Sequence, residues 1–137
     1  MNTPTRAELT DWARNYVELW NAGDKERWAA NWRKLAPGNF TMNDPVGTPQ
    51  KTGFEHCALD SFDLFQPTLR FRISDGSMFI CGNEVAWLME NHFEQDGVST
   101  VLRSIETYRF EPDGSVVPPT YYDVPQQSEG EIGELFK

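Results

Sequence analysis

Glu106 is the residue whose type and position point most directly to chemistry. It lies in Val98–Glu111, where the side chains alternate in character as they do along a β-strand. Arg103 and Arg109 mark the odd-numbered positions as the solvent face, so we expect Glu106 to point inward, among aromatic side chains. A carboxyl group in an apolar site resists ionisation, and the neutral acid can donate a hydrogen bond at neutral pH.

Each candidate residue also has an ordinary interpretation. Glu106 could pair with an arginine, or the two faces of its strand could be reversed, and the alternation supports these readings about as well as the first. Asp44, which precedes Pro45, fits a residue that caps a turn, and Tyr16 fits a core ring on the apolar face of a helix. Taken singly, none of the three predicts an active site.

Two short helices forming a hairpin are expected at the N-terminus. Thr5 and Glu8 fit a capping box, and Asp24 fits the cap of the second helix. The first helix should end near Asn21-Ala22-Gly23, and Pro37-Gly38 should stop the second. The apolar stripe of the first helix comprises Leu9, Trp12, Ala13, Tyr16, Leu19 and Trp20.

A brief strand and a third helix are expected next. Residues 39–43 read as the strand, and Asp44-Pro45-Val46-Gly47 as the turn that follows it. Thr52 and Glu55 fit a second capping box, which would begin a helix that runs to the break before Pro67.

Beyond Pro67 the hydrophobic period changes to two, which predicts strands. Turn sequences separate them at Asp75-Gly76, Asp96-Gly97 and Pro112-Asp113-Gly114. The expected strands cover residues 69–73, 84–94, 98–111 and 115–124, and Pro118-Pro119 makes the last an edge or bulged strand. This order predicts an α+β fold in which helices cover one face of a mostly antiparallel sheet.

Size and composition favour one folded domain spanning residues 1–137, with residues 126–137 as a polar tail. Five Trp, nine Phe and four Tyr are too many rings for a disordered chain. The net charge of −9 argues against nucleic acid and anionic membranes as partners, and no segment is long and apolar enough for a membrane span. Without a signal peptide or paired CxxC spacing, Cys57 and Cys81 are expected to be reduced thiols in the cytoplasm, with a single disulfide left open.

Several segments together resemble the ketosteroid isomerase branch of the nuclear transport factor 2-like, or SnoaL-like, superfamily. They are residues 16–19 (Tyr-Val-Glu-Leu) with 21–24 (Asn-Ala-Gly-Asp), 44–47 (Asp-Pro-Val-Gly) and 105–110 (Ile-Glu-Thr-Tyr-Arg-Phe). The likeness covers roughly residues 1–124. It implies a cystatin-like conical fold, with three N-terminal helices packed on a strongly curved sheet that encloses an apolar pocket.

The resemblance implies roles for three residues of this chain. Asp44 matches the carboxylate base that removes a proton next to the substrate carbonyl and returns it two carbons further along. Tyr16 matches the phenol that donates to the developing dienolate oxygen, and Glu106 matches a second donor that is normally a protonated Asp. The chain would thus be a cofactor-independent isomerase of a steroid-like substrate, and it would need neither a metal nor a nucleotide. Its expected substrate-binding residues are Trp20, Trp32, Phe62, Trp87, Met89, Tyr108 and Tyr122.

The chain departs from the family pattern at three positions. Glu106 is one methylene longer than Asp, and Trp32 and Ser61 stand where better-known isomerases have tyrosines that support the catalytic phenol. Relatives also act as hydrolases, dehydratases or cyclases, or only bind hydrophobic ligands, so these functions remain alternatives. Epoxide hydrolysis in the family depends on an Asp-Arg-Asp arrangement, and a cyclase-like role would pair His92 with Asp44.

The family also implies a homodimer that forms through the outer face of the sheet. Val101 and Ile105, which are expected on that face, are more apolar than a solvated strand needs.

Overall fold

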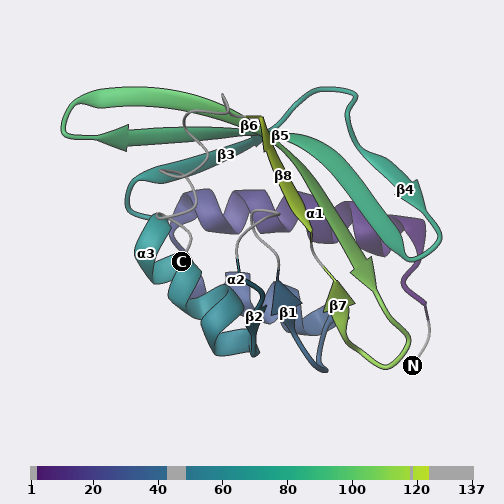
Figure 1. The fold of residues 1–137 in the computed structure, drawn as a ribbon. Helices are drawn as coiled ribbons and strands as arrows, with labels where there is room; N and C mark the ends of the chain where they lie inside the picture. The colour runs from purple at the N-terminus through teal and green to yellow at the C-terminus, as the bar shows by residue number, and fades with distance from the viewer. Residues whose placement is uncertain (1–2, 43–48, 118, 124–137) are drawn as a thin grey trace.

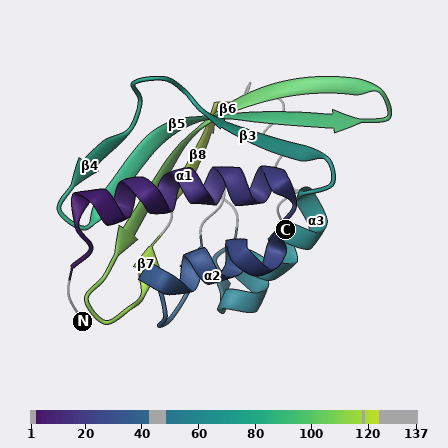
Figure 2. The same ribbon diagram turned by 180° about the vertical axis from the view of Figure 1, so that it is seen from behind.

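Helices and a curved antiparallel sheet form the two layers of the molecule (Figure 1). The structure is a computed structural model, and it describes residues 3–42, 49–117 and 119–123. The helices cover one face of the sheet, and the view from behind shows α1 running across it (Figure 2). The sheet stays open rather than closing into a barrel. The predicted α+β class and cone-like arrangement are confirmed.

The two N-terminal helices form as predicted. Helix α1 spans Arg6–Ala22 and α2 spans Lys25–Leu35. Both hydrogen bonds of the capping box between Thr5 and Glu8 are present at the start of α1. Gly23 ends α1 in the left-handed conformation, with a φ of 72°, which a residue without a Cβ adopts at little cost. Asp24 then caps α2 by accepting the backbone N–H of Arg27.

The third helical segment differs from its prediction at its start. Strand β1 (Thr41–Met42) pairs with β2 (Lys51–Thr52), so Thr52 lies opposite Thr41 in a small sheet and caps no helix. The predicted second capping box is therefore wrong. A π-helical turn, η1 (Glu55–Leu59), begins the segment without a side-chain cap and continues into α3 (Asp60–Phe65).

Within the described residues the main sheet has six strands, all paired antiparallel. They are β3 (Leu69–Ile73), β4 (Phe79–Cys81), β5 (Glu84–Gln95), β6 (Val98–Phe110), β7 (Val116–Val117) and β8 (Thr120–Asp123). Strands run in the order β3-β5-β6-β7, while β4 also pairs with β5 and β8 with β6. The short β4 was not among the expected strands. The last expected strand is split into β7 and β8, in keeping with its two prolines.

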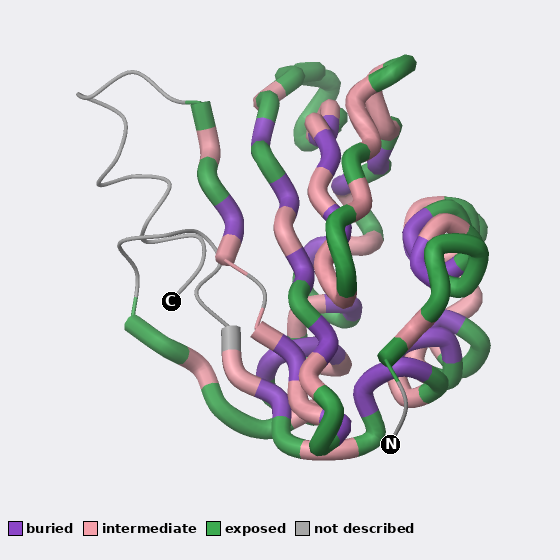
Figure 3. Tube along the Cα trace, turned by 90° about the vertical axis from the view of Figure 1, so that its right-hand side faces the viewer, coloured by how far each residue is buried: buried purple, intermediate pink, exposed green. Residues whose placement is uncertain are grey.

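Strands β5 and β6 present the predicted faces. In β6 the side chains of Ser104, Glu106, Tyr108 and Phe110 are buried, whereas the odd-numbered positions are half-buried or exposed. The alternation of burial is visible along the sheet in Figure 3. Asp96 and Gly97, with φ values of 52° and 77°, close the hairpin as expected of this dipeptide.

The last turn of α1 binds the free edge of β3. The indole N–H of Trp20 donates to the carbonyl of Leu69 over 2.9 Å. The amide of Asn21 both donates to the carbonyl of Phe71 and accepts its N–H, each over 2.8 Å. Three backbone groups that an edge strand would leave to solvent are thereby satisfied. These hydrogen bonds fix the position of α1 relative to the sheet.

Replacing Asn21 by alanine should therefore destabilise the fold. We expect Asn21→Ala to lower the free energy of unfolding by about 2 kcal/mol, because two hydrogen bonds are lost and half-buried backbone groups lose their partners. Urea denaturation followed by tryptophan fluorescence measures the change. Asn15→Ala, on the same helix and without a side-chain hydrogen bond in the described structure, is the matched control. An Asn21 effect no larger than that of Asn15 would contradict this role.

Candidate functional site

An aromatic cavity lies between the helices and the concave face of the sheet. Its lining residues come from the helices, from β2 and from the sheet; they are Tyr16, Trp20, Trp28, Trp32, Lys51, Cys57, Ser61, Phe65, Leu69, Phe71, Glu106 and Tyr122. The space between these atoms amounts to about 500 Å³, part of it open to solvent. Only about 40 Å³ of this space is wide enough for the centre of a water molecule, so the cavity is narrow.

Glu106 is inside this cavity with only 3 % of its surface exposed. The Ser104 hydroxyl donates to Oε2 over 2.8 Å, and the Tyr108 hydroxyl donates to Oε1 over 3.0 Å. Ser104 in turn accepts a hydrogen bond from the side-chain amide of Asn91 over 2.9 Å, which leaves its own proton for Glu106. The inward orientation of Glu106 is thus confirmed. A chain of polar groups on β5 and β6 fixes the position of its carboxyl group.

Tyr16 enters the same cavity from the middle of α1. Its ring is 6 % exposed and stacks on Phe71 with 5.8 Å between the centroids and 13° between the planes. The Tyr16 and Tyr108 rings have centroids 5.9 Å apart. The helix and the sheet therefore bring a phenol and a carboxyl group, 90 positions apart in sequence, to one cavity.

The two positions at which supporting tyrosines are missing have other roles here. The Trp32 ring packs edge-on against Tyr16, with centroids 5.6 Å apart and planes at 89°. The Ser61 hydroxyl donates to the carbonyl of Cys57 over 2.8 Å, one turn back in its own helix. The ring of Tyr16 is thus oriented by aromatic packing, from Trp32 on one side and Phe71 on another.

The other expected site residues divide into three groups. Asp44, the expected base, lies outside the described residues. Trp20, Trp32 and Tyr122 line the cavity. Phe62, Trp87, Met89 and Tyr108 are buried in the core behind its walls, where Tyr108 contributes through its bond to Glu106.

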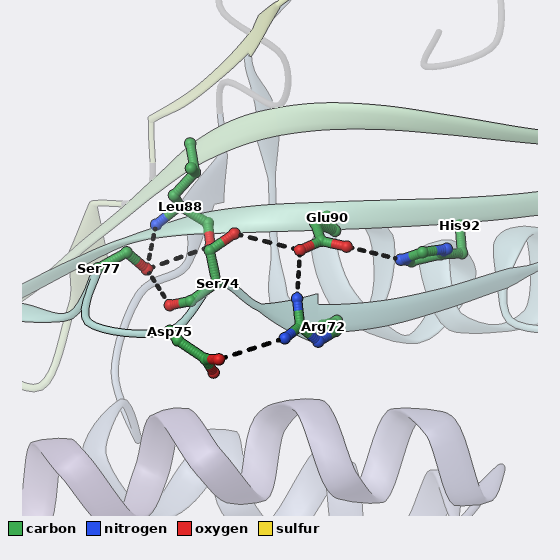
Figure 4. Close-up of polar contacts among 7 residues, drawn as sticks. All are labelled: Arg72, Ser74, Asp75, Ser77, Leu88, Glu90 and His92. Carbon is green, nitrogen blue, oxygen red and sulfur yellow. Dashed lines mark hydrogen bonds and ion pairs between the residues drawn. The ribbon is translucent and has the colours of Figure 1, made fainter.

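His92 and the strand arginines lie away from the cavity. His92 is on the outer face of β5, with Nε2 3.1 Å from Oε1 of Glu90, and Arg72 forms an ion pair with the same carboxylate (Figure 4). The hydrogen bond with His92 and, to a smaller extent, the interactions with Arg72 lower the pKa of Glu90 below its ordinary value. The remaining arginines of β3 and β6, Arg70, Arg103 and Arg109, are exposed as well. None of these four arginines lines the cavity.

Lys51 and Cys57 line the cavity without having been expected there. Burial raises the pKa of the Cys57 thiol to about 11, against a smaller opposing effect of the Lys51 charge. The Cys57 position follows from the π-helical turn η1, which no local pattern in the sequence predicts. The Lys51 position follows from the pairing of β2 with β1, whereas the sequence pattern predicts that a helix begins at the next residue, Thr52.

Within the described residues, no three His, Cys, Asp or Glu side chains are close enough to hold a metal ion. No described helix is long and apolar enough to cross a membrane. Both cysteines are free thiols, Cys57 buried and Cys81 exposed.

Comparison with solved structures identifies the architecture. An NTF2-like protein of unknown function from Cytophaga hutchinsonii superposes with a TM-score of 0.63 at 18% identity, covering 90% of this chain and 95% of that one. A protein described as a candidate SnoaL-like polyketide cyclase from Jannaschia gives 0.65 at 15%, covering 90% of both chains. An LEH-like epoxide hydrolase from Mycobacterium tuberculosis gives 0.66 at 12%, covering 88% and 86%.

These likenesses show that the chain has the NTF2-like fold, as the sequence resemblance implied. No protein-family model matches the chain. At these identities the shared fold does not select an activity, which has to be argued from the site.

The two thiols should differ sharply in reactivity. Because its pKa is near 11 and it is buried, Cys57 should resist alkylation by iodoacetamide in the folded protein at pH 8, whereas the exposed Cys81 should react readily. Mass spectrometry of the native protein should find one modified thiol, and after unfolding two. Cys81→Ser should then show none until it is unfolded. Rapid native labelling of Cys57 would contradict the described packing.

Proposed function

We propose that the protein is a cofactor-independent isomerase, which shifts a double bond into conjugation with the carbonyl group of a lipophilic substrate. The observation that carries this proposal is the placement of Glu106 and Tyr16 in one aromatic cavity, with the Glu106 carboxyl almost fully buried. The sequence resemblance to ketosteroid isomerases supports it, because these two residues match the oxyanion donors of that family and Asp44 matches the base.

In the proposed reaction, Asp44 removes a proton from the carbon between the carbonyl and the double bond. The electron pair of that C–H bond moves toward the carbonyl, so negative charge gathers on the oxygen of a dienolate. Tyr16 and the neutral form of Glu106 donate hydrogen bonds to this oxygen, and their fixed positions avoid reorganisation during the reaction. Asp44 then returns the proton to the far end of the dienolate, which yields the conjugated ketone.

The hydrogen bonds to Glu106 are compatible with the donor role. A neutral carboxyl group has one O–H and lone pairs on both oxygens, so Ser104 and Tyr108 can donate to it while its own proton faces the substrate. They also hold the longer Glu side chain in place, which compensates for the extra methylene relative to Asp.

The narrowness of the cavity bears on the substrate. A drug-sized ligand occupies a pocket of roughly 300–1,000 Å³, and the free space here reaches that range only when its solvent-open part is included. We infer that a small cyclic ketone fits the site as it stands, and that a full steroid requires the walls to move apart.

Removing the donors should slow turnover in a graded way. Tyr16→Phe should reduce kcat for a β,γ-unsaturated cyclohexenone by about 10²–10³-fold, the usual effect of losing one oxyanion donor. Asp44→Asn should reduce it further, because the proton then has no acceptor. Glu106→Gln, whose amide still donates, should be milder than Glu106→Ala. Absorbance of the conjugated enone follows the reaction, and turnover unchanged in Asp44→Asn would rule the proposal out.

A second candidate is a pocket protein that binds a lipophilic ligand without isomerising it. It is favoured by the two hydroxyl groups that donate to Glu106, since such donors also stabilise an ionised carboxylate that could not donate in turn. A structure described as a computationally designed 17-OHP binder has the same fold, with a TM-score of 0.64 at 21% identity. Ligand binding without exchange of the ligand's α-protons in heavy water would select this candidate.

We also propose that the protein forms a homodimer through the outer face of the sheet. Val101, Ile105 and Tyr121 are each about half exposed there, and Ile105 lies directly opposite Tyr121 in the β6–β8 pair. Exposed apolar patches of this kind are typical of interfaces between protein chains.

The two free thiols suit a reducing compartment, and we propose the cytoplasm.

A charge placed on the outer face of the sheet should separate the protomers of the proposed dimer. Sedimentation of the wild type at micromolar concentration should give twice the 15.7 kDa of the chain, and Ile105→Lys should shift it to the monomer. Leu64→Lys, at an exposed apolar position on α3, should leave the dimer intact and serves as the control. A monomeric wild type would refute the dimer.

A further inference from the structure

The aromatic cavity contains a positive charge that the proposed reaction does not use. Lys51, on β2, is the one basic residue among the described residues of the lining, which are otherwise aromatic, aliphatic or small polar side chains and Glu106. It forms no ion pair or side-chain hydrogen bond with the described part of the chain, whereas Lys25 has Asp63 as its partner. Its charge acts on a neighbouring residue of the lining, because it opposes the rise in the pKa of the Cys57 thiol.

Two walls of the cavity also hold hydrogen-bond donors without acceptors. Among the described residues, four buried polar atoms lack a hydrogen-bond partner: the indole nitrogens of Trp12, Trp28 and Trp32, and Oγ1 of Thr120. Trp28 and Trp32 belong to the lining of the cavity. Both rings are almost fully buried, at 2 % and 0 % exposed, so a ligand reaches these nitrogens only if the walls of the cavity move apart.

We propose that the cavity takes a lipophilic keto acid, whose carboxylate is bound by Lys51 while its ketone is presented to Tyr16 and Glu106. The location of the ketone rests on the proposed function, whereas the carboxylate rests on Lys51. A cation beside an apolar wall attracts a carboxylate more strongly than it would in water, because the surroundings screen the charges less. Because the net charge of the whole chain, −9, repels anions, an anion needs such a local partner to enter the cavity.

A small keto acid also suits the narrow cavity. A keto acid with a single ring offers apolar surface to the aromatic walls and two polar ends, and it is smaller than a steroid. Lys51 and Glu106 supply different chemistry within one lining, a cation for the permanent anion and an acid for the oxygen that becomes negative only during the reaction.

Isothermal titration calorimetry with 4-oxo-4-phenylbutanoate and its neutral methyl ester tests the inference. The wild type should bind the acid at least about tenfold more tightly than the ester, a difference of about 1.4 kcal/mol. Lys51→Met should remove this preference by weakening the acid alone. Lys34→Met, which makes the same change in net charge at an exposed position on α2, should leave it unchanged.

The possible outcomes separate this inference from the proposed function. Equal affinity for acid and ester, no binding of either compound, or equal effects of the two lysine variants would overturn the keto acid. If the Lys51-dependent preference is found but no enone is turned over, the carboxylate site stands and the isomerase proposal fails. If a neutral enone is isomerised and Lys51→Met makes no difference to acid binding, the isomerase stands and the keto acid fails.

Discussion

The docking of α1 on the free edge of β3 is the constraint on which the site depends. Trp20 and Asn21 satisfy backbone groups of β3 and so fix both the position and the rotation of α1. Tyr16 lies one turn before Trp20 on the same buried stripe, so its ring is directed over the concave face. Helix α1 thereby lines the cavity opposite the sheet, and α2, α3, η1 and β2 supply the rest of the described lining.

Strict alternation along β5 and β6 supplies the second half of the site. Because neighbouring side chains point to opposite faces, Glu106 comes inside together with Ser104 and Tyr108, and its paired position on β5 is Trp87. The arginines of β6, Arg103 and Arg109, lie on the outer face for the same reason. The buried Glu106 carboxyl needs partners, and Ser104 and Tyr108 donate to it, while Asn91 donates to Ser104.

Much of this could be predicted from the sequence, because it rests on periodicity and local caps. Thr5 and Asp24 cap backbone groups within three residues of themselves, and Gly23 and the Asp96-Gly97 turn act through their own φ angles. The inward face of β6 follows from its alternation. The pairing of Lys51 with β1 could not be predicted, since it depends on contacts across the loop between two short strands. The same holds for the π-helical turn at Cys57, and for the packing of Trp32 on Tyr16, at a position where better-known ketosteroid isomerases have a tyrosine. Long-range packing decides these positions.

The proposed isomerisation requires that the Glu106 carboxyl is neutral and donates a hydrogen bond inside the cavity. Infrared difference spectroscopy of the wild type against Glu106→Gln, at neutral pH with the conjugated ketone bound, observes this group directly. The account predicts the C=O stretch of a protonated carboxylic acid, which shifts in heavy water. A spectrum with only the two carboxylate bands would show an ionised Glu106 and contradict its role as a donor.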